Sequence, residues 1–292
     1  MRFGVVILPD AGWPELRARW VEAQARGFHV AWTYDHLSWR SLRDSPWLGS
    51  IPMLAAAAAS TTTLRLGTLV TSPNFRHPAV LAKDAMTLDQ ISAGRFDLGI
   101  GAGGVGFDSE VLGQPVLTPA ERSERFAEFV ETLDELLRNP ATSHEGAYYT
   151  AHESRTFPGC VQQPRVPFTI AAAGPKAMRL AARYGQTWVT YGPLKPHTDA
   201  ADWFDQVRRQ VQRIDAICEQ LGRDPRSLRR MALVGLELHW AQSSVDAWDE
   251  FQGSVEEMGF TDIAIHWPRP SDPELPGPPP AVFDEVSRRL RG

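Results

Sequence analysis

The sequence predicts a (β/α)8 barrel, in which helices surround a closed parallel sheet. Apolar runs of strand length alternate with amphipathic helical stretches along the chain, as repeated strand–helix units require. The chain has 292 residues, which is normal for such a barrel of typically about 250. No GxGxxG turn opens a helix after the first strand, which disfavours the alternative, an open doubly wound sheet. Without an internal repeat or linker, residues 1–292 are expected to form one domain.

The first half of the chain contains four predicted strand–helix pairs. Turn residues mark several of their ends: Pro9 follows the first strand, Pro14 begins the first helix, and Gly27 and Gly94 follow the first and third helices. The second helix is rich in alanine, which suits close packing on a sheet. The predicted strands are 3–8, 28–34, 64–71 and 95–100. The predicted helices are 14–26, 46–60, 80–91 and 119–137.

The second half completes the barrel after an interruption. Residues 144–164 lack a periodic pattern and are predicted to be an inserted loop, within about 140–165, that gates substrate over the barrel mouth. Regular alternation then resumes. The predicted strands are 168–171, 187–190, 231–238 and 262–266. The predicted helices are 176–184, 200–221, 245–258 and 281–291.

Composition excludes several classes of protein. The net charge of −5 gives no electrostatic footprint for nucleic acid. The two cysteines, Cys160 and Cys218, are far apart and form no CxxC, so neither a zinc site nor a disulfide framework is predicted, and no metal is expected. The longest apolar run, 51–59, is too short to cross a bilayer, and the first strand begins without a signal-peptide pattern. A cytoplasmic protein with a small-molecule substrate is expected.

Candidate site residues follow the predicted strands, because barrels of this type place the active site at the carboxyl ends of their strands. His36 is the best candidate for proton transfer, since an ordinary histidine pKa lies near 6.5. Asp35 could orient a neighbour, although adjacent side chains on a strand point in opposite directions. Alternatively, Asp35 caps a turn and His36 is only a polar residue at a strand end. The other candidates at strand ends are Trp39, Thr71, Ser72, Gly103, Gly104, Ala173, Gly174, Thr190, Tyr191, His266 and Trp267.

The sequence Gly174-Pro175-Lys176 opens a predicted helix directly after a strand. Free N–H groups and the helix dipole at such an end favour an anion, so a phosphate site is predicted there. The alternative is an ordinary tight turn in which proline starts the helix.

Four segments carry a resemblance to a known family. They are HPAVLAKDAMTLDQISAGRFDLGIGAG at 77–103, WTYDHL at 32–37, IAAAGP at 170–175 and GQTWVT at 185–190. Together they resemble the luciferase-like flavin and deazaflavin oxidoreductases, most of all the branch that uses coenzyme F420. The resemblance covers roughly two-thirds of the chain in order and weakens after Gly192. It implies a TIM barrel of the bacterial luciferase type, and a homodimer formed through barrel helices.

The resemblance also implies roles for individual residues. His36, paired with Asp35, would touch the cofactor and transfer a proton, and Trp39 would lie over its reactive face. Leu69 and Val70 would be joined by a cis peptide in a bulge, 69–72, behind the cofactor ring. Residues expected to hold the ring edge or the phosphate are Gly103, Gly104, Ala172, Ala173, Gly174, Pro175, Lys176 and Thr190.

One departure bears on the substrate. The sugar-phosphate dehydrogenases of this family have an acidic Glu where this chain has Gly104, and their basic residues near the last strands have no clear counterpart. His266 and Trp267 stand there, and with Trp39 and Tyr191 they are the candidate substrate contacts. A bulky, less charged substrate is therefore expected.

Three functions remain open at this stage. The first is an F420-dependent oxidoreductase that transfers a hydride between deazaflavin C5 and an organic substrate, by reduction of a C=C, C=N or C=O bond or in the reverse direction. The second is an FMN-dependent monooxygenase of the luciferase type. The third is a non-catalytic barrel that binds a ligand. The pair Asp35-His36 together with the sequence AAAGP favours the first.

Overall fold

The fold is described from a computed structural model. The structure describes residues 1–37, 39, 42–104, 107–192, 199–235, 238–269 and 277–290, without the side chain of Phe107. Residues 236, 237 and 291, which belong to predicted elements, lie outside this described part.

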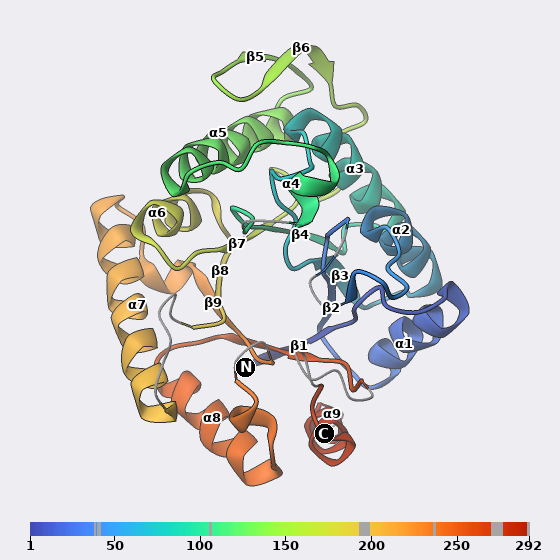
Figure 1. Ribbon diagram of the computed structural model, residues 1–292, viewed down its shortest axis with the longest axis vertical. Coiled ribbons are helices and arrows are strands. Elements are labelled where there is room, and N and C mark those ends of the chain that lie inside the picture. Colours follow the sequence, from blue (N-terminus) through green and yellow to red (C-terminus); the bar gives the residue numbers. More distant parts are fainter. Residues whose placement is uncertain are drawn as a thin grey trace.

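Eight parallel strands close into a barrel, and helices surround it (Figure 1). The order around the barrel is β1-β10-β9-β8-β7-β4-β3-β2, with β1 paired to both β10 and β2. The predicted (β/α)8 fold class is therefore confirmed. The barrel strands are β1 (Arg2–Val6), β2 (Val30–Thr33), β3 (Arg65–Thr68), β4 (Phe96–Ile100), β7 (Phe168–Ala171), β8 (Thr187–Thr190), β9 (Arg229–Leu233) and β10 (Asp262–His266).

Most helices lie where the sequence predicts them, within a few residues. The observed helices are α1 (Trp13–Ala25), α2 (Ser50–Ser60), α3 (Pro78–Ile91), α5 (Pro119–Arg138), α6 (Pro175–Tyr184), α7 (Ala200–Gln220), α8 (Val245–Glu257) and α9 (Pro280–Arg289). Short elements that the sequence did not predict are α4 (Phe107–Val111) and the 3-10 turns η2 (Pro225–Ser227) and η3 (Trp240–Gln242). None of the described helices is both long and apolar enough to cross a membrane.

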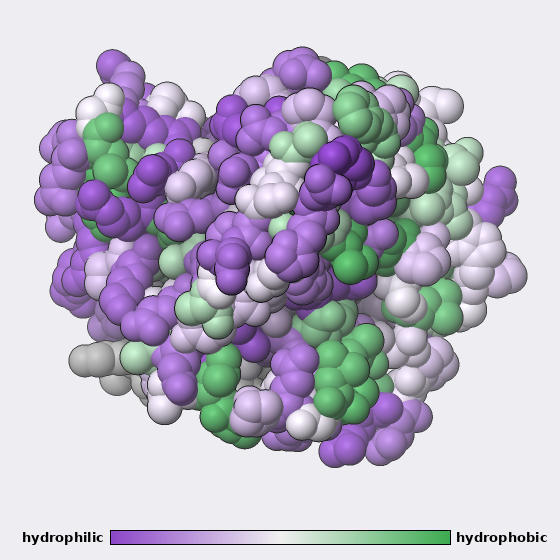
Figure 2. Space-filling view, turned by 90° about the horizontal axis from the view of Figure 1, so that it is seen from above, coloured by the Kyte–Doolittle hydropathy of each residue, from purple (hydrophilic) through white to green (hydrophobic). Residues whose placement is uncertain are grey.

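An insertion lies between α5 and β7 as predicted, but the expectation that residues 144–164 form an irregular loop is wrong. This region contributes to an antiparallel hairpin of β5 (Ala141–Glu145) and β6 (Thr150–Arg155). Figure 1 shows the hairpin outside the ring of helices, beyond α5, and not over the end of the barrel. Its strands are mostly exposed, so no alternation of apolar and polar residues marks them in the sequence. Figure 2, seen from the hairpin side, shows apolar patches among predominantly hydrophilic residues.

The barrel strands separate two apolar layers, because successive side chains point to opposite faces. Val5 and Ile7 belong to the large core between the sheet and the helices, whereas Val6 and Leu8 belong to a smaller cluster inside the barrel. Inner positions are Val30, Trp32, Tyr34, Leu69, Val189, Met231, Leu233 and Ala264. Gly67 makes room for this filling, since a Cβ there would lie 2.7 Å from Trp32 Cζ3. The inner cluster closes the barrel interior and forms a floor under the loops at the strand ends.

Candidate active site

His36 lies just beyond the carboxyl end of β2 and is fixed by several contacts. Its Nδ1 is 2.6 Å from Asp108 Oδ2, and the Trp47 indole N–H donates to its backbone carbonyl at 2.9 Å. Asp108 is 4% exposed, and its second oxygen accepts from the backbone N–H of Leu37 at 2.7 Å. Because a carboxylate oxygen accepts hydrogen bonds, Nδ1 carries the hydrogen of the neutral ring. The other nitrogen, Nε2, is thereby the one left for chemistry.

Aromatic rings surround His36. Trp39 lies with its ring centroid 4.5 Å from that of His36, at 39°. Tyr34 stands edge-on to Trp39 at 5.2 Å and to His36 at 6.4 Å. The predicted neighbours His36 and Trp39 are therefore brought together, and Tyr34 is an additional member that the sequence did not single out.

Asp35 has a different position from the one expected of a catalytic partner. Its carboxylate is 1% exposed and accepts from Arg76 Nε at 3.0 Å and Arg76 Nη2 at 2.7 Å, and it also accepts from the Ser50 hydroxyl. These contacts join the loop after β2 to the loop after β3 and to the start of α2. Asp108, and not Asp35, orients His36. Direct contact of Asp35 with a cofactor stays a prediction.

The segment after β3 lies between the ends of β3 and β4. The Leu69–Val70 peptide bond is cis, as the resemblance implies. The Thr71 backbone bonds to Gly99 and Gly101, both at 2.9 Å, and Ser72 is 2% exposed. The Thr71 hydroxyl is buried and has no hydrogen-bond partner among the described residues. Such an atom is well suited to a polar group of a ligand.

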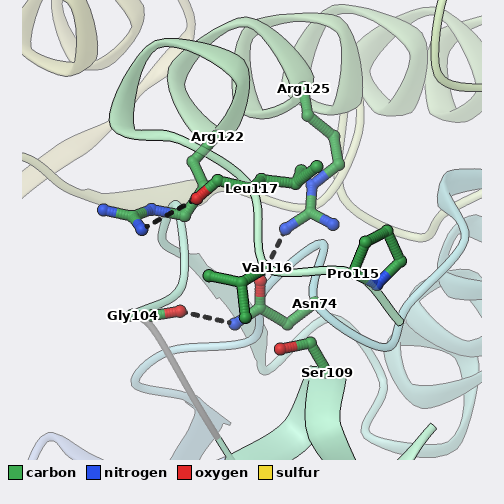
Figure 3. Close-up of a pocket in the computed structure, with 8 residues that line it drawn as sticks. All are labelled: Asn74, Gly104, Ser109, Pro115, Val116, Leu117, Arg122 and Arg125. Carbon is green, nitrogen blue, oxygen red and sulfur yellow. Dashed lines mark hydrogen bonds between the residues drawn. The ribbon is translucent and has the colours of Figure 1, made fainter. Parts of the chain in front are cut away.

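The loop after β4 is held by an amide and a buried cation (Figure 3). Asn74 Nδ2 donates to the Gly104 carbonyl at 3.0 Å, and Arg125 Nη2 donates to Asn74 Oδ1 at 2.5 Å. Gly103 has φ +75°, and a Cβ there would lie 2.6 Å from Asn74 Nδ2, so glycine is required. The small pocket beside these residues is lined by Asn74, Gly104, Ser109, Pro115, Val116, Leu117, Arg122 and Arg125.

The loop after β7 leads into the start of α6. Gly174 is the N-cap residue of α6, and Pro175 is the first helical residue. No side chain caps this end of the helix. A Cβ at Gly174 would meet no atom within 4 Å, and Lys176 is exposed nearby. Ala172 is buried and its carbonyl accepts from the Trp188 indole at 2.7 Å, which fixes the approach to the helix. The first N–H groups of α6 therefore have no side-chain cap, and the space beside Gly174 is open.

The Thr190 side chain is held inside the fold, and contact of the backbone near it with a phosphate stays a prediction. Thr190 is 4% exposed; its hydroxyl donates to Gln210 Oε1 at 2.9 Å and accepts from the Gly192 N–H at 3.0 Å. The side chain thus ties the end of β8 to α7. Tyr191, the next residue, is 38% exposed at the rim.

Of the last predicted substrate residues, His266 is buried and Trp267 is half-buried. His266 is 1% exposed, and both ring nitrogens have partners: Tyr34 Oη at 2.8 Å and the Val234 carbonyl at 2.8 Å. The Trp267 ring packs on Phe283 of α9 at 5.0 Å. Direct substrate contact by His266 is therefore not supported by this geometry, because burial and paired nitrogens leave no surface for it.

Sequence reasoning missed Asp108, Arg76 and Arg125. Asp108, in the short helix α4, follows the glycine-rich turn after β4, and Arg76 follows the turn after β3, so both lie beyond strand ends. Their position in the sequence could have suggested Asp108 and Arg76 as candidates, but only the structure shows which residues they contact. Among the described residues, no group of three or more His, Cys, Asp or Glu side chains could hold a metal ion.

The fold and the loops at the strand ends define a class of protein. The luciferase-like monooxygenase family matches residues 1–275, and the chain belongs to that family.

Individual relatives give a finer comparison. The chain is 36% identical over 180 residues to an F420-dependent glucose-6-phosphate dehydrogenase of Beutenbergia cavernae, covering 60% of this chain and 52% of that protein. It is 30% identical over 244 residues to a 4-hydroxyprotoasukamycin monooxygenase of Streptomyces nodosus subsp. asukaensis, covering 82% and 62%. It therefore spans between half and two-thirds of these relatives. A solved F420-dependent secondary alcohol dehydrogenase, with an F420–acetone adduct, has the same fold with a TM-score of 0.79, 17% identity and coverage of 100% and 99%.

Proposed function

We propose that this protein is a coenzyme F420-dependent oxidoreductase, which transfers a hydride between deazaflavin C5 and an organic substrate. The observation that carries the proposal is the His36–Asp108 pair at 2.6 Å, which leaves Nε2 of His36 for proton transfer at the end of the barrel. The relative from Beutenbergia cavernae, named as F420-dependent, supports the choice of cofactor.

The loops fit a planar cofactor with a phosphate. Cβ atoms at Gly104 and Gly174 would meet nothing within 4 Å, so the backbone at both loops borders open space. The buried Thr71 hydroxyl without a partner among the described residues lies between β3 and β4. We assign the ring to the loops after β2, β3 and β4, and the phosphate to the first N–H groups of α6. When bound, the deazaflavin supplies a hydride donor or acceptor at C5.

The residues of the chain supply orientation, shielding and a proton. Asp108 keeps the hydrogen of the neutral His36 ring on Nδ1, so Nε2 accepts a proton, and the protonated ring can return it from the same atom. Trp39 and Tyr34 pack against this ring and cover part of it, and the His36 side chain stays 21% exposed. Arg76 and Asp35 hold the loop that carries His36. Positioning of this kind contributes more to rate than any single added contact.

The structure favours a bulky and weakly charged substrate. Gly104 leaves open space where an acidic residue would stand in the sugar-phosphate dehydrogenases of the family. Leu37 and Tyr191, on loops after β2 and β8, are 43% and 38% exposed. We therefore propose substrates with an apolar body and a reducible C=C, C=N or C=O group.

An FMN-dependent monooxygenase is the second candidate, and the similarity to a 4-hydroxyprotoasukamycin monooxygenase favours it. The two are separated by titrating the purified protein with F420 and with FMN and following cofactor fluorescence. Micromolar binding of F420 with weak FMN binding is expected. Tight binding of FMN with weak binding of F420 would instead support an oxygen-dependent monooxygenase. Binding of neither cofactor would favour a non-catalytic barrel.

Replacing Gly174 with aspartate is expected to weaken F420 binding at least tenfold, about 1.4 kcal/mol. The new carboxylate would stand against the phosphate at the start of α6. Since φ at Gly174 is −94° and no atom lies within 4 Å of a Cβ there, steric strain is not the cause. Gly174→Asn is the matched control, with the same shape and no charge. Unchanged affinity in both variants would place the phosphate elsewhere.

We further propose that the chain acts in the cytoplasm as one domain and as a homodimer. On α3, Val80 and Ile91 are 58% and 45% exposed and are candidate apolar contacts with a second copy, among the exposed polar residues Lys83, Thr87 and Gln90. Sedimentation velocity distinguishes a dimer from a monomer directly.

A further inference from the structure

A buried hydrogen-bonded pair lies next to the rings of His36 and Trp39. Tyr34 Oη is 2.8 Å from His266 Nε2, and His266 Nδ1 is 2.8 Å from the Val234 carbonyl oxygen. Tyr34 is 3% exposed and His266 is 1% exposed. Proton transfer by His36 and Asp108 does not involve His266.

The two hydrogen bonds determine where the hydrogens lie. A carbonyl oxygen can only accept, so His266 Nδ1 carries a hydrogen. Burial lowers the pKa of His266 to about 4, so the ring is neutral at physiological pH and its Nε2 is an acceptor. The Tyr34 hydroxyl must then donate to Nε2. The hydrogen bonds therefore run in one direction, from the Tyr34 hydroxyl to His266 Nε2 and from His266 Nδ1 to the Val234 carbonyl.

The backbone is shaped around this pair. Gly235, which follows β9, has φ +121°, and a Cβ at this position would clash with His266 Nδ1. The chain after β9 thus passes close to the imidazole and presents the Val234 carbonyl to it. On the other side, β10 pairs with β1 in register at Val6 and His266. The ring of His266 is held by the Val234 carbonyl after β9 and by Tyr34 after β2, while its backbone pairs with β1.

Tyr34 transmits this constraint to the site. Its ring lies edge-on to His266 at 5.6 Å, to Trp39 at 5.2 Å and to His36 at 6.4 Å. A tyrosine bonded at its hydroxyl end cannot turn about χ1 without losing that bond, so the ring is a fixed surface for both neighbours. Asp108 holds His36 by a separate contact, through Nδ1.

We propose that His266 is a positioning residue, which acts through Tyr34 to hold the His36 and Trp39 rings at the angle at which they meet a bound cofactor. The part that concerns the cofactor rests on the proposed function. The hydrogen positions and the ring packing do not, and they can be measured without any cofactor.

The first test is nitrogen NMR of cofactor-free protein labelled with ¹⁵N in histidine, with the His266 signals assigned from His266→Gln. His266 is expected to be neutral at pH 6, with its hydrogen on Nδ1. A His266 ring that is protonated at pH 6, or that carries its hydrogen on Nε2, would overturn the proposal, because Tyr34 would then not be the donor.

The second test is Tyr34→Phe, which keeps the ring and removes the hydroxyl. The His36 ring signals are expected to shift, and F420 affinity is expected to fall about fivefold, because the His36 and Trp39 rings must then be ordered when the cofactor binds. His266→Phe should give a similar change. The double variant should be no worse than either single variant, because both remove the same link. His266→Gln, which retains a donor and an acceptor, should restore part of the affinity.

Tyr149→Phe is the matched control. Tyr149 is also buried, at 8% exposed, and its hydroxyl has no partner among the described residues. Its ring packs on His77 and Phe129, away from His36. Unchanged His36 signals and unchanged F420 affinity in folded Tyr34→Phe would refute a positioning role. If the unmodified protein fails to bind F420, the proposed function fails, whereas the NMR measurements still decide the role of His266.

Discussion

Replacing His36 with alanine is expected to lower turnover by at least about a hundredfold, the usual contribution of a positioned acid or base. The F420 dissociation constant should change by less than about tenfold, far less than turnover, since the phosphate is assigned to α6 and the ring largely to backbone. The measurements are kcat with the best substrate from a screen of unsaturated and carbonyl compounds, and cofactor affinity by fluorescence.

Asp108→Asn tests the His36–Asp108 pair by changing the carboxylate instead of the imidazole. The amide keeps the shape of the carboxylate but can present an N–H to His36 Nδ1, which would move the ring hydrogen to Nε2. Turnover is expected to fall, with cofactor affinity retained. His152→Ala, on the exposed strand β6, is the control and should be silent. Unchanged turnover in folded His36→Ala would remove this residue from proton transfer.

Replacing Arg76 with methionine is expected to lower the free energy of unfolding by about 3–5 kcal/mol, because the Asp35 carboxylate would remain buried without its cation. Asp35 is 1% exposed and accepts two hydrogen bonds from Arg76, at 2.7 and 3.0 Å. Denaturant unfolding measures the change, with the slope m checked for constancy.

The control for this variant is Arg208→Met. Arg208 also pairs with an aspartate, Asp205 at 2.7 Å, but the side chains are 53% and 61% exposed. Water solvates Asp205 when its partner is lost, so a change within about 0.5 kcal/mol is expected. Similar losses in the two variants would mean that the Asp35–Arg76 pair is solvated in solution, and that Asp35 is free to meet a ligand.

The barrel could be predicted from the sequence because it depends on local periodicity. Strand-length apolar runs, helical spacing and turn residues recur over short windows, and each window predicts its own element. His36 was found for the same reason, since it directly follows a predicted strand. Its partner was not found, because Asp108 lies 72 residues further along the chain and follows a loop without periodicity.

The same limit explains the other misplaced residues. Asp35 was assigned to chemistry because it neighbours His36, yet its carboxylate points to Arg76, 41 residues away. His266 stands at a strand end like the true candidates, but it points to Tyr34, 232 residues away, inside the barrel. Which of several polar residues at strand ends face the opening depends on long-range pairing of loops. No local sequence pattern predicts this long-range pairing.

The position of β10 between β1 and β9 has a consequence during synthesis on the ribosome. β1 emerges first, but its partner at Asp262–His266 emerges some 260 residues later. Until then both β1 and β9 present unpaired backbone edges, to which other chains can add strands. The nascent protein therefore carries its greatest risk of aggregation just before closure, which makes chaperone protection most valuable at that stage.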